Sequence, residues 1–104
     1  MRSERFQNLV IEHPNNVMFR FSLGQALVEE GRPGDALDHL VHCCRQKSDW
    51  MMARILLGKA FLALDRPQEA LPHLEDALKL AIDQQHEAPE AELRALLADL
   101  KQKR

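Results

Sequence analysis

The sequence is poor in the residues that favour β-sheets and lacks an apolar segment long enough to cross a membrane. Aromatic residues make up 5% of its 104 residues, and tyrosine is absent. Its uninterrupted apolar runs, such as residues 55–58, fall far short of the about 20 residues of a transmembrane helix and the about 7 to 15 of a secretory signal. We therefore expect a cytoplasmic protein.

An excess of one charge is also missing. The 14 basic and 16 acidic residues give a formal net charge of −2. This balance is too weak and too mixed to drive counterion-release binding to nucleic acid or attraction to anionic lipid. We expect neither nucleic acid nor membrane as a partner.

Cysteine is scarce, because Cys43 and Cys44 are the only two and they are adjacent. Neighbouring helical side chains point about 100° apart, so this pair cannot crosslink the fold. With His39 and His42 they form the one cluster that resembles a metal site, since His39 and Cys43 share a helical face. A closed zinc site takes four ligands, and no second Cys/His pair exists to complete it. We favour buried thiols that pack as small apolar side chains, with no cofactor; a metal-binding protein is the remote alternative.

Signals for catalysis are absent as well. Ser3, Ser22 and Ser48 have no histidine and acid at a meaningful spacing, and no Gly-rich phosphate loop occurs. The acidic pairs at 29–30 and 75–76 are typical of solvated helix surfaces rather than of acid/base pairs. We expect that the protein is not an enzyme.

The sequence does contain abundant helix-forming residues and an internal repeat. Alanine and leucine dominate alongside Glu, Lys and Arg, which favours an all-α fold. Shifting the sequence by 34 residues against itself aligns many identities. The matched pairs are Arg20 with Arg54, Leu23-Gly24 with Leu57-Gly58, Ala26 with Ala60, Arg32-Pro33 with Arg66-Pro67, Ala36-Leu37 with Ala70-Leu71, and His39-Leu40 with His73-Leu74.

Each repeated unit shows helical apolar spacing twice, with a break at residues 30–33 in the first unit and 65–67 in the second. Each unit is therefore predicted to be helix, turn, helix. Asp65 is expected to cap the helix that follows it, with Pro67 in the first turn of that helix. Pro72 lies beyond the first turn and predicts a bend.

Two glycines interrupt the first helix of their units. Gly24 and Gly58 each cost about 1 kcal/mol relative to alanine at such positions. Close approach of the paired helix would offset that cost, with the small Ala36 and Ala70 providing the recess.

Each unit has a Leu-Gly pair, a large apolar residue three positions later (Leu27, Phe61), and an Ala followed four positions later by Leu. This pattern resembles the tetratricopeptide repeat. The resemblance covers residues 15–84, although Arg20 and Arg54 stand where the family usually has tryptophan. It implies a right-handed superhelical stack of helix-turn-helix repeats.

One domain spanning residues 1–104 is expected. Its first repeat lies at about 15–48 and its second at about 49–84. A helix over residues 2–12 would be an N-terminal half-repeat, because its apolar residues are in frame with those of the second helix of the next unit. A capping helix is predicted at about 89–103, with acidic residues in its first turn and basic residues in its tail.

The resemblance also implies a function, because arrays of this kind hold peptides in a concave groove lined by their first helices. When the family's groove positions are transferred to this sequence in the frame of the repeat, the groove residues are Met18, Phe21, Gln25, Val28, Glu29, Met52, Ile55, Lys59 and Leu62, with Ala63 beside them. The Lys and Asn of a carboxylate clamp are replaced here, so we expect a scaffold that binds an apolar or amphipathic peptide of another protein. Homodimerisation is the alternative, because two repeats are fewer than the about three usually needed for stability.

Overall fold

The computed structural model describes residues 1–102, and within them it contains six helices and no strand. The helices are α1 (Arg2–Glu12), α2 (Val17–Glu29), α3 (Pro33–Gln46), α4 (Met51–Ala63), α5 (Pro67–Asp83) and α6 (Glu87–Gln102). The predicted all-α repeat fold is confirmed. The capping helix begins at Glu87 rather than at 89, and the predicted end at 103 lies outside the described residues, as do Lys103 and Arg104 of its basic tail.

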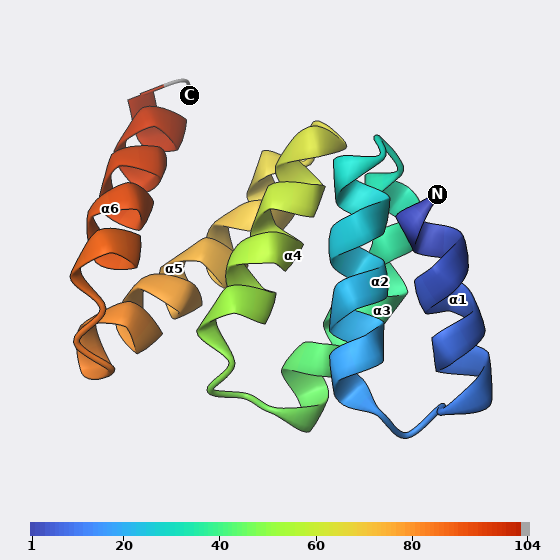
Figure 1. The fold of residues 1–104 in the computed structure, drawn as a ribbon. Helices are drawn as coiled ribbons and strands as arrows, with labels where there is room; N and C mark the ends of the chain where they lie inside the picture. The colour runs from blue at the N-terminus through green and yellow to red at the C-terminus, as the bar shows by residue number, and fades with distance from the viewer. Residues whose placement is uncertain (103–104) are drawn as a thin grey trace.

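The helices form a row of antiparallel pairs (Figure 1). α2 packs on α3 and α4 packs on α5, while α1 packs on α2 and α6 packs on α5. In the view of Figure 1, α2 and α4 lie in front of α3 and α5. The first helix of each repeat therefore faces the viewer, and the second helix forms the back layer.

The core of each repeat contains a fully buried leucine pair, Leu23 with Leu40 and Leu57 with Leu74. The two interior glycines let these leucines approach. A Cβ atom added to Gly58 would lie 2.6 Å from Cδ2 of Leu74. The close neighbour is thus the large leucine of the paired helix. The backbone oxygen of Ala70 would also lie 3.6 Å from that Cβ atom, so the paired helix approaches closely at the glycine, as expected.

Local sequence explains where the helices begin. The Asn16 side chain accepts hydrogen bonds from the backbone N–H groups of Met18 and Phe19 at the start of α2. Pro33 and Pro67 occupy the first turns of α3 and α5, where their missing N–H group is not needed. Pro72 lies inside α5, which continues as one helix through it.

Three helices end in the same way, with a residue in the left-handed region: Gly31 after α2 (φ 78°), Asp65 after α4 (φ 58°) and Gln85 after α5 (φ 58°). After α4, the N–H group of Arg66 bonds the carbonyl of Phe61 and that of Asp65 bonds the carbonyl of Leu62. This is the Schellman pattern. The prediction that Asp65 caps α5 is wrong, because Asp65 terminates α4 and Arg66 holds the N-cap position of α5.

Opposite substitutions at equivalent turns should change stability in opposite directions. Gly31→Ala should lower the free energy of unfolding by about 1–2 kcal/mol, because a side chain is strained in the left-handed region. Asp65→Gly should raise it by up to about 1 kcal/mol, because the same strain is removed. Urea unfolding followed by circular dichroism measures both changes. Equal signs for the two variants would contradict this explanation.

Candidate functional site

The predicted groove residues of α2 have different environments. Met18 is 53% exposed, and Gln25 and Glu29 are exposed, whereas Phe21 and Val28 are half-buried. Met18 therefore presents an apolar side chain to solvent at the start of this helix.

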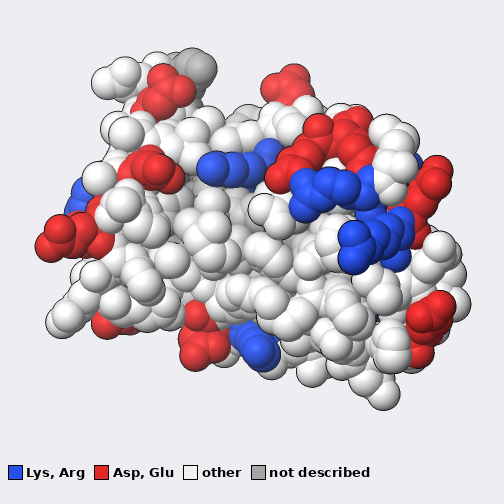
Figure 2. All heavy atoms as spheres, in the orientation of Figure 1, with Lys and Arg blue, Asp and Glu red and all other residues white. Residues whose placement is uncertain are grey.

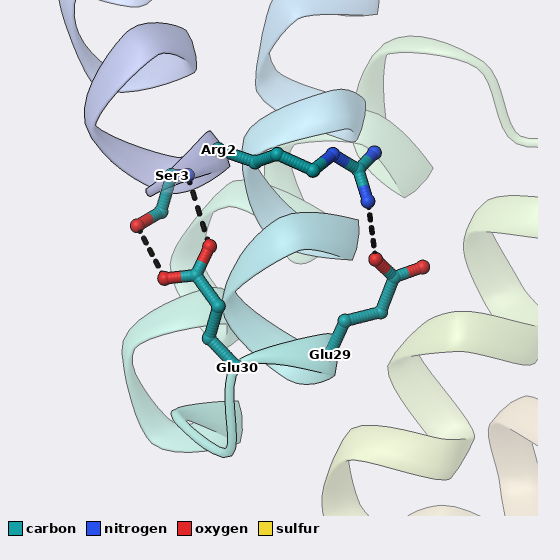
Figure 3. A network of polar contacts seen from close by, with 4 residues as sticks. All are labelled: Arg2, Ser3, Glu29 and Glu30. Carbon is teal, nitrogen blue, oxygen red and sulfur yellow. Dashed lines mark hydrogen bonds and ion pairs between the residues drawn. The ribbon is translucent and has the colours of Figure 1, made fainter.

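Glu29 and the neighbouring Glu30 anchor α1 (Figure 3). Glu29 pairs with Arg2. Glu30 accepts hydrogen bonds from the backbone N–H group of Ser3 (2.9 Å) and from its hydroxyl (2.6 Å). The hydroxyl bond from Ser3 is the main cause that lowers the pKa of Glu30, and the site is the first turn of α1, where a negative charge is favourable. Both acids thus hold the N-terminal helix.

The predicted residues of α4 divide into two groups. Met52 is 49% exposed and lies in the first turn of the helix. Farther along, Ile55 is buried, and together with the exposed Lys59 it lines a recess of about 240 Å³ that also includes Leu93 of α6. Leu62, which is half-buried, lines a separate and larger cleft. The predicted groove is therefore not one uniform strip, because Ile55 and Lys59 share a recess with side chains of α6, whereas Leu62 lines the separate cleft.

An aromatic pair lies between α2 and α4. The rings of Phe21 and Trp50 are stacked, with centroids 4.8 Å apart and planes 19° apart. Met18 lies one turn before Phe21, and Met52 follows closely after Trp50. We call Met18, Phe21, Trp50 and Met52 the methionine–aromatic surface. Sequence reasoning missed Trp50, although it is the only tryptophan of the chain.

The charges on this side of the molecule lie mostly toward its edges. Figure 2 shows a broad uncharged area across the middle of the face, with acidic groups along the α6 side and a mixed cluster at the upper right. The ammonium group of Lys47 lies 5.4 Å from the ring centroid of Trp50, where a cation is attracted to the ring face. The middle of the face is thus mainly uncharged.

The two arginines at the usual tryptophan positions reach from the first to the second helix of each repeat. Arg20 lies 3.4 Å from Nδ1 of His39. Arg54 donates a hydrogen bond to the carbonyl of Ser48 and pairs with Asp76 at 3.6 Å. At the positions where the family usually has tryptophan, these arginines thus make polar contacts between the two helices of a repeat.

The two repeated histidines are partly buried beside these arginines. Loss of solvent lowers the pKa of His39 and of His73, and the charges of Arg20 and Arg54, respectively, lower them further. His73 also stacks on the ring of Phe61, with centroids 5.7 Å apart. Both histidines are therefore more readily protonated in the unfolded chain than in the folded one.

The protein should consequently lose stability in mild acid. Above the ordinary histidine pKa of 6.5, the two histidines are neutral in both the folded and the unfolded chain. Below it, they bind protons in the unfolded chain first. The free energy of unfolding therefore falls as the pH decreases from 6.5 toward the lowered pKa values of the folded chain. The urea midpoint should be lower at about pH 5.5 than at about pH 7.5. A His39→Gln/His73→Gln variant should show a much smaller difference, and an unchanged difference would contradict this assignment.

Cys43 and Cys44 are buried in the core. The Cys43 thiol faces the carbonyl of Val17 at 3.7 Å, and burial raises its pKa to about 11. Burial also raises the pKa of Cys44. These thiols pack as small apolar groups, in agreement with the favoured interpretation of the sequence. Across residues 1–102, no group of three or more His, Cys, Asp or Glu residues is placed to hold a metal ion.

Antiparallel helix pairs stacked in a row define this chain as a helical-repeat protein. Two family models described as tetratricopeptide repeat match residues 3–40 and 51–76, and the chain belongs to this family. The first match includes α1, in agreement with its interpretation as part of the repeat frame. Proteins built from these repeats generally serve as protein–protein interaction modules.

A solved structure has the same fold. The solution structure of protein BPP2914 from Bordetella parapertussis aligns with a TM-score of 0.84 and 23% sequence identity, covering 99% of this chain and 90% of that one. No curated protein matches the sequence. Within the described residues, none of the helices combines the length and apolar character needed to span a membrane.

Proposed function

We propose that the protein is a non-catalytic scaffold in the cytoplasm that binds an apolar or amphipathic segment of another protein on the methionine–aromatic surface. The observation that supports this most is that Met18 (53%) and Met52 (49%) are half-exposed and lie within three residues of the stacked Phe21 and Trp50 along the chain. Methionine adapts its shape to a partner, and stacked aromatic rings provide a rigid contact area.

Other features support the same proposal. The face shown in Figure 2 has a broad uncharged area, as an apolar ligand requires. Glu29 at the end of α2 and Glu30 directly after it hold α1 and are not arranged as an acid/base pair. Two buried, unpaired cysteines fit a reducing compartment.

A pull-down from the native host tests the proposal. Met18→Glu and Met52→Glu should each reduce recovery of the bound protein at least about tenfold, because a charge would be buried against an apolar ligand. Ile11→Glu and Ile82→Glu are matched controls, since these exposed isoleucines lie on α1 and α5, which contribute no residue to the surface. Equal recovery by all four variants and the wild type would refute the proposal.

Self-association through the same surface is the second candidate, because exposed methionines can also be covered by another copy of the chain. Light scattering across a range of concentrations separates the two functions. A persistent dimer that Met18→Glu dissociates, with no other protein recovered in the pull-down, would favour self-association. A monomer would favour a foreign ligand.

A further inference from the structure

The two methionines of the methionine–aromatic surface are equivalent residues of the two repeats. Met18 and Met52 are 34 residues apart, which is the period of the repeat, and each is the second residue of its helix. They are 53% and 49% exposed, whereas Met51, the direct neighbour of Met52, is 6% exposed and belongs to the core. A dissolved reagent that attacks sulfur therefore reaches the same position in both repeats and does not reach Met51.

The two cysteines do not compete for such a reagent. Cys43 and Cys44 are buried, and the thiolate is the form of cysteine that reacts with peroxides. Burial raises the pKa of the Cys43 thiol to about 11 and also raises the pKa of Cys44. A methionine thioether has no proton to lose, so its oxidation requires exposure alone. The exposed methionines are therefore the first sulfur atoms that a peroxide oxidises in this protein.

Oxidation by hydrogen peroxide converts a methionine thioether to a sulfoxide. An electron pair of the sulfur attacks one peroxide oxygen, so that an S–O bond forms and the O–O bond breaks. The transferred oxygen gives its proton to the departing hydroxide, which leaves as water. The sulfur is oxidised and the peroxide is reduced. A flexible apolar side chain thereby becomes a polar one.

The fold tolerates a sulfoxide at the two surface positions. Met18 and Met52 lie in the first turns of α2 and α4 and are about half exposed, so water can hydrate the added oxygen. At Met51 the same oxygen would be buried among apolar side chains and would destabilise the core. Oxidation of the exposed methionines thus changes the chemistry of the surface while the helices remain folded.

Binding of an apolar ligand is more sensitive than the fold. Phe21 and Trp50 are half-buried, so Met18 and Met52 are the more exposed members of the methionine–aromatic surface. A partner that covers them removes water from any sulfoxide oxygen, and an apolar partner offers that oxygen no hydrogen bond in return. Enzymatic reduction of the sulfoxide regenerates the thioether and with it the apolar surface.

We propose that oxidation of Met18 and Met52 by peroxide is a reversible switch that releases the partner from the methionine–aromatic surface. The inference rests on the proposed function, because a switch requires a bound partner. The signal is read by two equivalent positions at once, so both repeats lose their apolar contact under the same conditions.

Peptide mapping by mass spectrometry after treatment with dilute hydrogen peroxide measures which residues react. Met18 and Met52 should gain oxygen at least about tenfold faster than Met51, whose oxidation requires local opening of the core. The circular dichroism of the helices should stay unchanged while the two surface methionines react. Equal rates at Met51 and Met52, or loss of the helical signal as the surface methionines react, would overturn the proposal.

A pull-down with treated and untreated protein measures the switch itself, with the peroxide removed before the lysate is added. Oxidation should reduce recovery of the bound protein at least about fivefold, and a methionine sulfoxide reductase should restore it. Met18→Leu/Met52→Leu is the matched variant, because leucine keeps the apolar volume and cannot be oxidised. It should recover the partner equally before and after treatment, although it retains the exposed Met1. Met18→Gln/Met52→Gln should bind as weakly as the oxidised wild type.

The outcomes separate the switch from the function on which it rests. If the untreated wild type recovers no protein, the proposed function is refuted and the switch with it. Unchanged recovery by wild type in which both surface methionines are oxidised overturns the switch alone. An equal loss of recovery by the wild type and the leucine variant would place the effect of peroxide elsewhere in the protein and also overturn the switch.

Discussion

Replacing Leu74 by Ala should lower the free energy of unfolding by about 2–5 kcal/mol, and adding Gly58→Ala should recover part of that loss. Leu74 is fully buried, and an added Cβ at Gly58 would lie 2.6 Å from its Cδ2 atom and 2.7 Å from its Cγ atom. In the wild-type background Gly58→Ala alone overpacks the pair, at a cost of about 1–3 kcal/mol. With Leu74 shortened, the same methyl group enters free space and gains about 1 kcal/mol of helix propensity.

Urea unfolding of the wild type, both single variants and the double variant measures this coupling. We expect the two changes to be non-additive by about 2 kcal/mol or more. Gly34→Ala is the matched control, because its nearest neighbour would lie at 3.8 Å, and it should be neutral or stabilising by up to about 1 kcal/mol in either background. Additive effects of Gly58→Ala and Leu74→Ala would show that the close approach has no energetic importance.

Pro72→Ala should have the largest stabilising effect of any single change considered, up to about 3 kcal/mol. Pro72 lies inside α5 and cannot donate a hydrogen bond to the carbonyl of Gln68, one turn earlier. Both residues are exposed, so water can hydrate the unpaired carbonyl, and the helix tolerates the proline without benefiting from it. The equivalent position of the first repeat holds Asp38, which shows that the fold does not require a proline there.

Thermal unfolding compares Pro72→Ala with Pro67→Ala, which lies in the first turn of the same helix. Pro67→Ala should be neutral or slightly destabilising, because a first-turn N–H group has no partner within the helix and the fixed proline φ angle is lost. A melting temperature for Pro72→Ala no higher than that for Pro67→Ala would refute the assigned cost. The bend predicted at Pro72 remains a separate prediction.

The repeat was predictable because it depends on local spacing that the sequence shows directly. The leucine and glycine positions recur at one offset, and the prolines mark the starts of α3 and α5. The turn at Asp65 was predicted wrongly, since Asp is common both as an N-cap and in the left-handed region. Only the backbone conformation separates the two roles, and here φ is 58°.

The candidate surface was predictable only in part. The frame identified Met18, Phe21 and Met52, but it could not show that Trp50, which precedes α4, would stack on Phe21 across two helices. The cleft that Leu62 lines together with residues of α5 and α6 was not predicted either. α5 has 17 residues where α3 has 14, so the next helix no longer starts in the frame of the repeat. Such a change in helix placement becomes visible only in three dimensions.

The attachment of the terminal helices has a consequence for how the molecule opens. In the described chain the backbone of α1 lies close only to that of α2, and the backbone of α6 lies close only to that of α5, so each end can detach without disturbing the other. Detachment of α1 must break its bonds to Glu29 and Glu30, whereas detachment of α6 removes one wall of the cleft. The cleft therefore lasts only as long as α6 stays docked, while the methionine–aromatic surface persists as long as the two central hairpins remain folded.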